Sequence, residues 1–111
     1  MRFLILSVFA FAACACGGAE VNVRNQSSTR LQDVVISAEG DSAAIDAVEP
    51  SAGGKTTICP KGETGSLELS FMADGKWHHS KHSLYFECNS SYRVLLNVSP
   101  EFETAAAVTL K

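Results

Sequence analysis

The chain has 111 residues, which is the size of one small domain. Hydrophobic residues make up 46% of it and charged residues 19%, a balance typical of a globular chain rather than a disordered one. A formal net charge of −3 gives the chain no general basic character, so we expect no nucleic-acid partner.

The first segment predicts an export signal. Arg2 supplies one positive charge, an apolar stretch follows, and small residues then surround Cys14 and Cys16. This order is typical of secretory signals. The apolar stretch is shorter than the ~20 residues that a membrane-spanning helix needs. We therefore expect residues 1–15 to be a signal peptide and the protein to be exported; the competing interpretation is a buried first element of the domain.

Small residues directly before a cysteine resemble the lipobox of bacterial lipoproteins, in which the cysteine carries the lipid and becomes the first mature residue. Cys16 and Cys14 are both candidates. Cleavage before Cys16 leaves Cys59 and Cys88 as an even pair, whereas cleavage before Cys14 adds a third thiol. An even number of remaining thiols favours a lipid on Cys16, with Cys14 as the alternative. Ordinary secretion with cleavage after Ala19 also leaves the even pair and stays open.

After a short tether over residues 16–20, residues 21–111 are expected to form one domain. Their apolar side chains recur with a period of two, which turns one face of a strand towards a core and the other towards water. The pattern predicts strands near residues 21–23, 31–37, 67–71, 92–98 and 106–110. The run at 31–37 is almost continuously apolar, which indicates a more central strand.

Turn-forming residues separate these strands at short intervals. Asp74-Gly75 is the sharpest hairpin signal, because both central positions of a type I′ turn need positive φ. Other loops are expected at residues 25–28, 40–42, 50–54, 60–62, 89–91 and 99–100. The best helical candidate, residues 42–48, is long enough for only one or two turns. Seven or eight short strands then predict an all-β, antiparallel, Ig-like sandwich.

Two cysteines lie at the ends of predicted strands. Cys59 and Cys88 are separated far enough to close a long loop, and an exported protein meets the oxidising conditions in which a disulfide persists. Such a bond stabilises a fold by ~3.6 kcal/mol in the chain-entropy model. Buried free thiols or a thiolate metal site are the alternatives. Because no Cys-x-x-Cys spacing occurs, we favour the disulfide.

Three histidines within five residues suggest a copper or zinc site. On the return strand of the Asp74-Gly75 hairpin, however, His78 and His79 point to opposite faces. His78 and His82 share a face but lie ~13 Å apart along it, too far for one ion. We therefore expect no metal and no cofactor, and keep a periplasmic metal-binding module as the alternative function. The same register pairs Phe71 with His78 and Leu67 with His82, which places two histidines on the face that carries Leu84 and Phe86. Either the hairpin is irregular there, or these histidines lie at an open end of the sandwich.

Catalytic motifs are missing. Gly53-Gly54-Lys55-Thr56 looks like the end of a phosphate-binding loop, but Glu49 stands where that loop needs glycine, so we expect an ordinary loop. No Gly-x-Ser-x-Gly motif occurs, and no carboxylates are paired on a strand in a way that suggests acid–base work, so the protein is not expected to be an enzyme. Asn25, Asn89 and Asn97 begin Asn-x-Ser sequences and are interpreted as turn and strand-surface residues.

As a whole, the chain resembles the small exported β-sandwich lipoproteins of Gram-negative bacteria. The resemblance rests on Val21-x-Val23-x-Asn25-x-Ser27, Leu31-x-x-Val34, Gly65-x-Leu67-x-Leu69-x-Phe71, Tyr85-Phe86-Glu87 and Tyr92-x-Val94-x-Leu96. It implies an outer-membrane lipoprotein facing the periplasm, with a soluble periplasmic or secreted protein as the alternative. Members of that broad class include inhibitors, immunity proteins and accessory subunits, which implies another envelope protein as the partner and a lipid anchor in the membrane.

Overall fold

The structure is a computed structural model that describes residues 17–62 and 64–111. These residues form eight strands and no helix, which confirms the all-β prediction. The strands are β1 (Ala19–Asn25), β2 (Leu31–Ala38), β3 (Asp41–Val48), β4 (Gly53–Ile58), β5 (Thr64–Ala73), β6 (Lys76–Phe86), β7 (Tyr92–Val98) and β8 (Thr104–Leu110).

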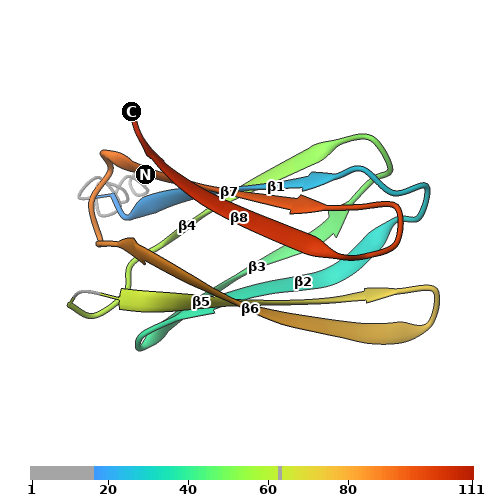
Figure 1. Cartoon of the computed structure of the whole chain (residues 1–111), viewed down its shortest axis with the longest axis horizontal. Coiled ribbons are helices and arrows are strands. Elements are labelled where there is room, and N and C mark those ends of the chain that lie inside the picture. Colours follow the sequence, from blue (N-terminus) through green and yellow to red (C-terminus); the bar gives the residue numbers. More distant parts are fainter. Residues whose placement is uncertain (1–16, 63) are drawn as a thin grey trace, which may run out of the picture.

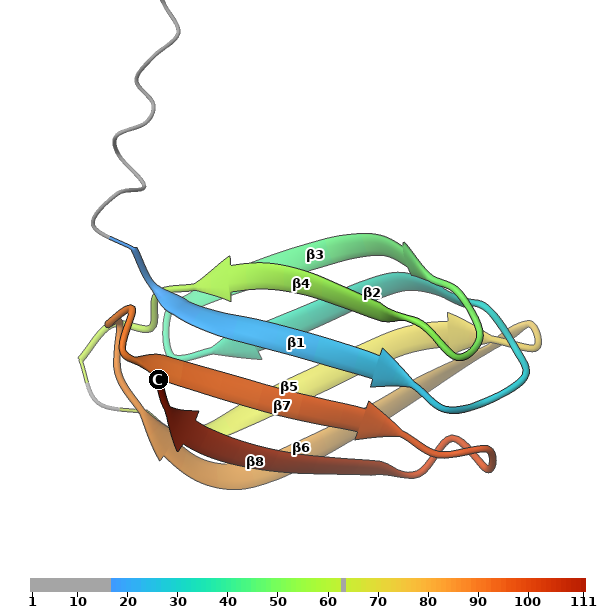
Figure 2. The same ribbon diagram turned by 90° about the horizontal axis from the view of Figure 1, so that it is seen from above.

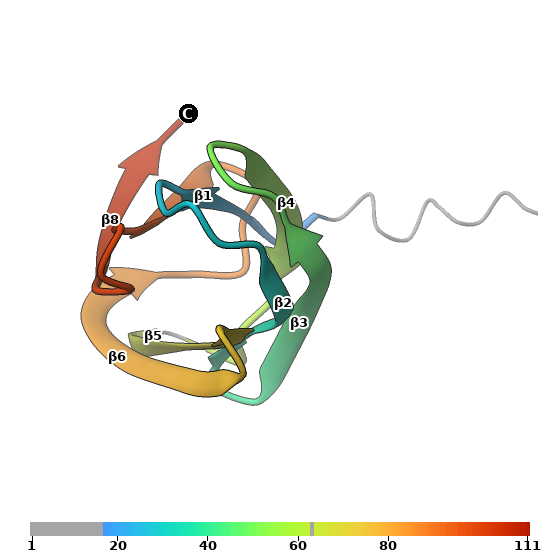
Figure 3. The ribbon, with the colours of Figure 1, turned by 90° about the vertical axis from the view of Figure 1, so that its right-hand side faces the viewer.

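Two four-stranded sheets stack face to face, as Figure 1 shows. The first sheet has the order β4-β1-β7-β8 and the second has the order β3-β2-β5-β6. Seen end-on, β6 lies near β8 along one side of the sandwich and β3 lies near β4 along the other (Figure 3). The predicted sandwich is confirmed. Neighbouring strands are antiparallel except β1 and β7, which run parallel.

The core lies between the sheets and follows the predicted alternation. In β1, Val21 and Val23 are buried while Glu20 and Arg24 face outwards. The same pattern buries the inward residues of β2, β5 and β7, including Val34, Ile36, Leu67, Leu69, Phe71, Val94, Leu96 and Val98. Each such side chain stabilises the fold by roughly 1.5–3 kcal/mol through the surface it removes from water.

Two elements differ from the sequence expectations. Residues 42–48, the best helical candidate, form most of strand β3, which pairs with β2. Gly53 and Gly54 belong to strand β4 rather than to a loop. A Cβ atom at Gly54 would lie 3.1 Å from Val48 and 3.2 Å from Ile45, so the glycine lets β4 pass close over β3.

The first strand also begins earlier than expected. Ala19 is fully buried and pairs with Ile58 of β4, so β1 begins two residues before the predicted domain boundary at residue 21. The part of the predicted tether that the structure describes before β1 is therefore Gly17 and Gly18.

The predicted hairpin is confirmed. Asp74 and Gly75 both have positive φ, 53° and 73°, as a type I′ turn requires. The register pairs Phe71 with His78 and Leu67 with His82, as expected from the turn position.

Candidate functional site

Several basic side chains lie on the outside of the first sheet; Figure 2 views this sheet from above. We call the outward side of β1, β4 and β7, together with Lys111, the cationic face. It carries four of the nine basic residues of the chain, Arg24, Lys55, Arg93 and Lys111. Glu20 is the one acidic residue in the four strands of this sheet. An open hollow of about 970 Å³ extends over the face from Glu20 to Gln26.

Three of these cations converge on Glu20. Its carboxylate lies 2.8 Å from Lys111 Nζ, 3.5 Å from Arg93 Nε and 4.0 Å from Lys55 Nζ. Asn22 Nδ2 also donates a hydrogen bond to it at 2.8 Å. The hydrogen bonds from Lys111 and Asn22, helped by the nearby charges, lower the pKa of Glu20 from 4.5 to about 2. Glu20 therefore stays ionised at neutral pH.

One carboxylate does not neutralise this face. Arg93 Nε lies within ion-pair range of Glu20 but is buried and makes no hydrogen bond. The side chain of Lys55 is 74% exposed, and Arg24 at the far end of β1 is also exposed. The result is a surface with an excess of positive charge in an acidic protein. Such a surface attracts anionic partners and repels basic ones.

A second surface is formed by the outward side of β6, which we call the aromatic face. It presents Trp77, 59% exposed, and Tyr85, 47% exposed, with His79 and Lys81 between them. Trp77 pairs with Met72 of β5, so two large apolar side chains stand side by side near the hairpin turn.

The backbone of β6 is available at the same place. A two-residue turn makes Ala73 and Lys76 a hydrogen-bonded pair, and pairs alternate along an antiparallel ladder. The N–H and C=O groups of Trp77 and His79 therefore point away from β5. Among the described strands, β6 has a backbone ladder with β5 alone. An edge of this kind accepts an added strand.

The structure does not bring the three predicted metal candidates together. His79 faces outwards, where Nδ1 shares a hydrogen bond with Ser70 at 2.9 Å. His82 faces inwards and bonds Thr104 of β8 at 2.8 Å. His78 stacks on Phe71, with 5.1 Å between the ring centres. No group of three potential metal ligands is assembled within the described residues.

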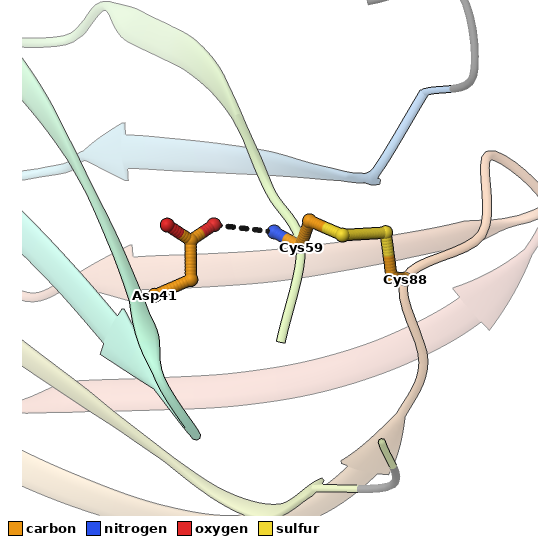
Figure 4. Close-up of a disulfide and its surroundings, with 3 residues drawn as sticks. All are labelled: Asp41, Cys59 and Cys88. Carbon is orange, nitrogen blue, oxygen red and sulfur yellow. Dashed lines mark hydrogen bonds between the residues drawn. A yellow bond between two sulfur atoms is a disulfide. The ribbon is translucent and has the colours of Figure 1, made fainter. Parts of the chain in front are cut away.

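The cysteine pair joins the two sheets, as Figure 4 shows. The sulfur atoms of Cys59 and Cys88 lie 1.98 Å apart, at bonding distance, so the structure supports the predicted pairing. Cys59 follows β4 of the first sheet, and Cys88 follows β6 of the second. Asp41 at the start of β3 accepts a hydrogen bond from the backbone N–H of Cys59 at 2.7 Å.

One buried polar residue was not recognised in the sequence. Asn25 is fully buried at the end of β1, not at a turn surface. Its Nδ2 donates to the carbonyl oxygens of Thr29 at 2.7 Å and Val48 at 3.1 Å, and its Oδ1 accepts from the N–H and the hydroxyl of Ser27. Asn25 therefore ties the β1–β2 loop to the end of β3 at one end of the sandwich.

The predicted signal peptide and the lipid-attachment candidates Cys14 and Cys16 lie outside the described residues. Within the described part, the structure contains no helix of the length and hydrophobicity needed to cross a membrane.

Comparisons with known proteins identify the fold alone. No family model matches the chain, and no curated protein matches it in sequence. The chain is similar to a protein from Eubacterium rectale solved by NMR, with a TM-score of 0.58 and 8% identity over 86% of this chain and 91% of that one. At this sequence identity, the similarity supports the sandwich architecture and gives no information about function.

Proposed function

We propose that the protein is an exported, non-catalytic binding module of the cell envelope, anchored by a lipid on Cys16 and facing the periplasm. In this proposal the aromatic face of β6 binds another envelope protein. The observation that carries it is Trp77, the one tryptophan of the chain, which is 59% exposed beside Met72 on an edge strand. Exposed tryptophans of this kind dominate the energy of many protein interfaces.

The start of β1 supports cleavage before Cys16. Ordinary secretion with cleavage after Ala19 would remove a fully buried residue that pairs with Ile58. Cleavage before Cys16 leaves β1 whole and places Gly17 and Gly18 between the lipid and the first strand.

The position of the aromatic face fits an anchored binder. The turn between β5 and β6 lies at the opposite end of the sandwich from the start of β1 (Figure 1). Trp77 comes two residues after that turn, on the sheet that does not contain β1. A domain attached through Gly17 would thus present Trp77 away from the bilayer, where a periplasmic partner has access.

Site-specific photocrosslinking in living cells tests this proposal. A crosslinking amino acid at position 77 is expected to trap one discrete partner protein. The same residue at position 110 is the matched control, because Leu110 is also a large exposed apolar side chain, 70% exposed, but lies on the first sheet. With the purified partner, Trp77→Ala should weaken binding by about 2 kcal/mol, roughly 30-fold in Kd, and Leu110→Ala should leave it unchanged.

Two outcomes would contradict the proposal. One is a set of crosslinks at position 77 that matches position 110 in intensity and diversity, as random collisions would give. The other is a partner whose affinity is the same for the wild type and for Trp77→Ala.

A further inference from the structure

Charge is segregated between the two sheets. Outside the cationic face, the strands of the second sheet contain the acidic residues Asp33, Asp41, Asp46 and Glu68 against two lysines, Lys76 and Lys81. The first sheet has the reverse balance, with Glu20 as its one strand carboxylate. An anionic surface therefore meets attraction on the cationic face and repulsion on the opposite sheet.

The basic residues lie next to the point of attachment. Lys55 and Lys111 line one small surface hollow together with Gly17 and Gly18. Cys16, the proposed lipid carrier, directly precedes Gly17 in the sequence. A lipid there would hold Lys55 and Lys111 within a few residues' length of the membrane surface, since an extended chain spans roughly 3.3–3.6 Å per residue.

The cations at this end are held in place and keep a net positive charge. Glu20 receives Lys111 at 2.8 Å and Arg93 at 3.5 Å, which orders both side chains on the sheet. The highly exposed Lys55 ammonium lies 4.0 Å from the same carboxylate. Three positive charges around one negative charge leave an excess of positive charge, which the phosphate groups of lipid headgroups can neutralise. Glu103, just before β8, is exposed and lies outside these ion pairs.

We propose that the cationic face docks on an anionic lipid surface and so fixes the orientation of the anchored domain. This inference rests on the proposed lipid anchor, which supplies the proximity; the charges supply the orientation. Covalent lipidation and a basic patch are separate contributions to membrane binding that act together in many proteins. Docking of this face leaves the second sheet, with Trp77, turned towards the periplasm.

Lysine footprinting on vesicles tests the docking directly. The mature protein purified from cells is bound to vesicles of phosphatidylcholine, or of phosphatidylcholine mixed with phosphatidylglycerol, and its lysines are acetylated and read by mass spectrometry. We expect Lys55 and Lys111 to become protected on the phosphatidylglycerol vesicles and to regain reactivity at high salt. Lys76 and Lys81 on the second sheet should react equally on both vesicles.

A matched pair of double variants isolates the charge effect. Arg24→Gln with Lys55→Gln removes two cations from the cationic face, and Lys76→Gln with Lys81→Gln removes two from the second sheet. Each cation near an anionic surface contributes about five-fold in partitioning. The first variant should therefore lose the phosphatidylglycerol-dependent protection of Lys111 and the second should keep it, while both retain the wild-type Tm.

The outcomes separate this inference from the anchor on which it rests. A lipidated protein whose Lys55 and Lys111 react equally on both vesicle types overturns the docking and leaves the anchor intact. An unlipidated protein that still sediments with phosphatidylglycerol vesicles refutes the anchor and supports the face. Protection of Lys55 that needs an added acidic protein, and not anionic lipid, overturns the docking in favour of a protein partner.

Discussion

Removing the bond between Cys59 and Cys88 should destabilise the domain by a calculable amount. The two residues are 29 positions apart, and the bond connects the end of β4 in one sheet with the end of β6 in the other. In the chain-entropy model, a loop of this length stabilises the fold by ~3.6 kcal/mol. With an unfolding entropy of about 2.1 cal/mol/K per residue, that corresponds to a fall in Tm of roughly 18 °C for a domain of this size.

The assay is urea unfolding of the Cys59→Ala, Cys88→Ala double variant, followed by circular dichroism in the strand region. Replacing both cysteines avoids the free thiol that a single replacement would leave. Wild-type protein in excess reductant is the control and should unfold at the same urea concentration as the double variant. A double variant within 1 kcal/mol of the oxidised wild type, at equal m-value, would refute the reasoning that this bond is a main source of stability.

Glu20, Asn25 and the three histidines can each be tested separately. Glu20→Gln should lower Tm at neutral pH. The fold lowers the pKa of Glu20 from its usual 4.5 to about 2. The stabilising charge of Glu20 is therefore fully present above pH 4.5 and is lost as the pH falls towards 2. Thermal melts of the two proteins should therefore converge over that range, and a constant difference would contradict the prediction. Asn25→Ala should lower the free energy of unfolding in urea by about 3 kcal/mol, since it leaves buried hydrogen-bonding partners unbonded. Asn25→Asp should also destabilise the fold, because it removes the donor to the Val48 carbonyl. A wild-type urea midpoint for either variant would be inconsistent with this hydrogen-bond network. Zinc should leave Tm unchanged, because His79 faces away from His78 and His82; a rise in Tm that is lost in His78→Ala would show that a site assembles after all.

Much of the fold was predictable because alternation is a strong signal where side chains are large. The stripe of Tyr92, Val94, Leu96 and Val98 and the turn at Asp74-Gly75 specified β7 and the β5–β6 hairpin. The elements that were missed have small side chains. β3 contains three alanines and two aspartates, and β4 begins with two glycines, so neither presents a clear apolar face in the sequence.

The candidate binding surfaces depend on contacts that no local pattern encodes. Glu20, Lys55, Arg93 and Lys111 are far apart in the sequence. The pairing of β1 with β4 and β7, and of β7 with β8, brings them together. The parallel β1–β7 pair joins strands separated by most of the chain, and its register follows from the packing of both sheets rather than from a turn. Asn25 was misread for a related reason, because its partner Val48 lies at the end of β3, 23 residues away in the sequence.

The direction of each histidine, in contrast, followed from the hairpin alone. Once the turn at Asp74-Gly75 sets the register, the two-residue period separates His79 from His78 and His82. The structure shows in addition that His82 bonds Thr104 of β8 and that His78 packs against the Phe102 ring. Both partners lie outside the β5–β6 hairpin.

We propose that the domain is held at a membrane through Cys16, and mass spectrometry of the mature N-terminus tests this attachment without further assumptions. We expect the first residue to be Cys16 carrying acyl chains, followed by Gly17 and an intact β1. A mature protein that begins with an unmodified Glu20 would contradict it.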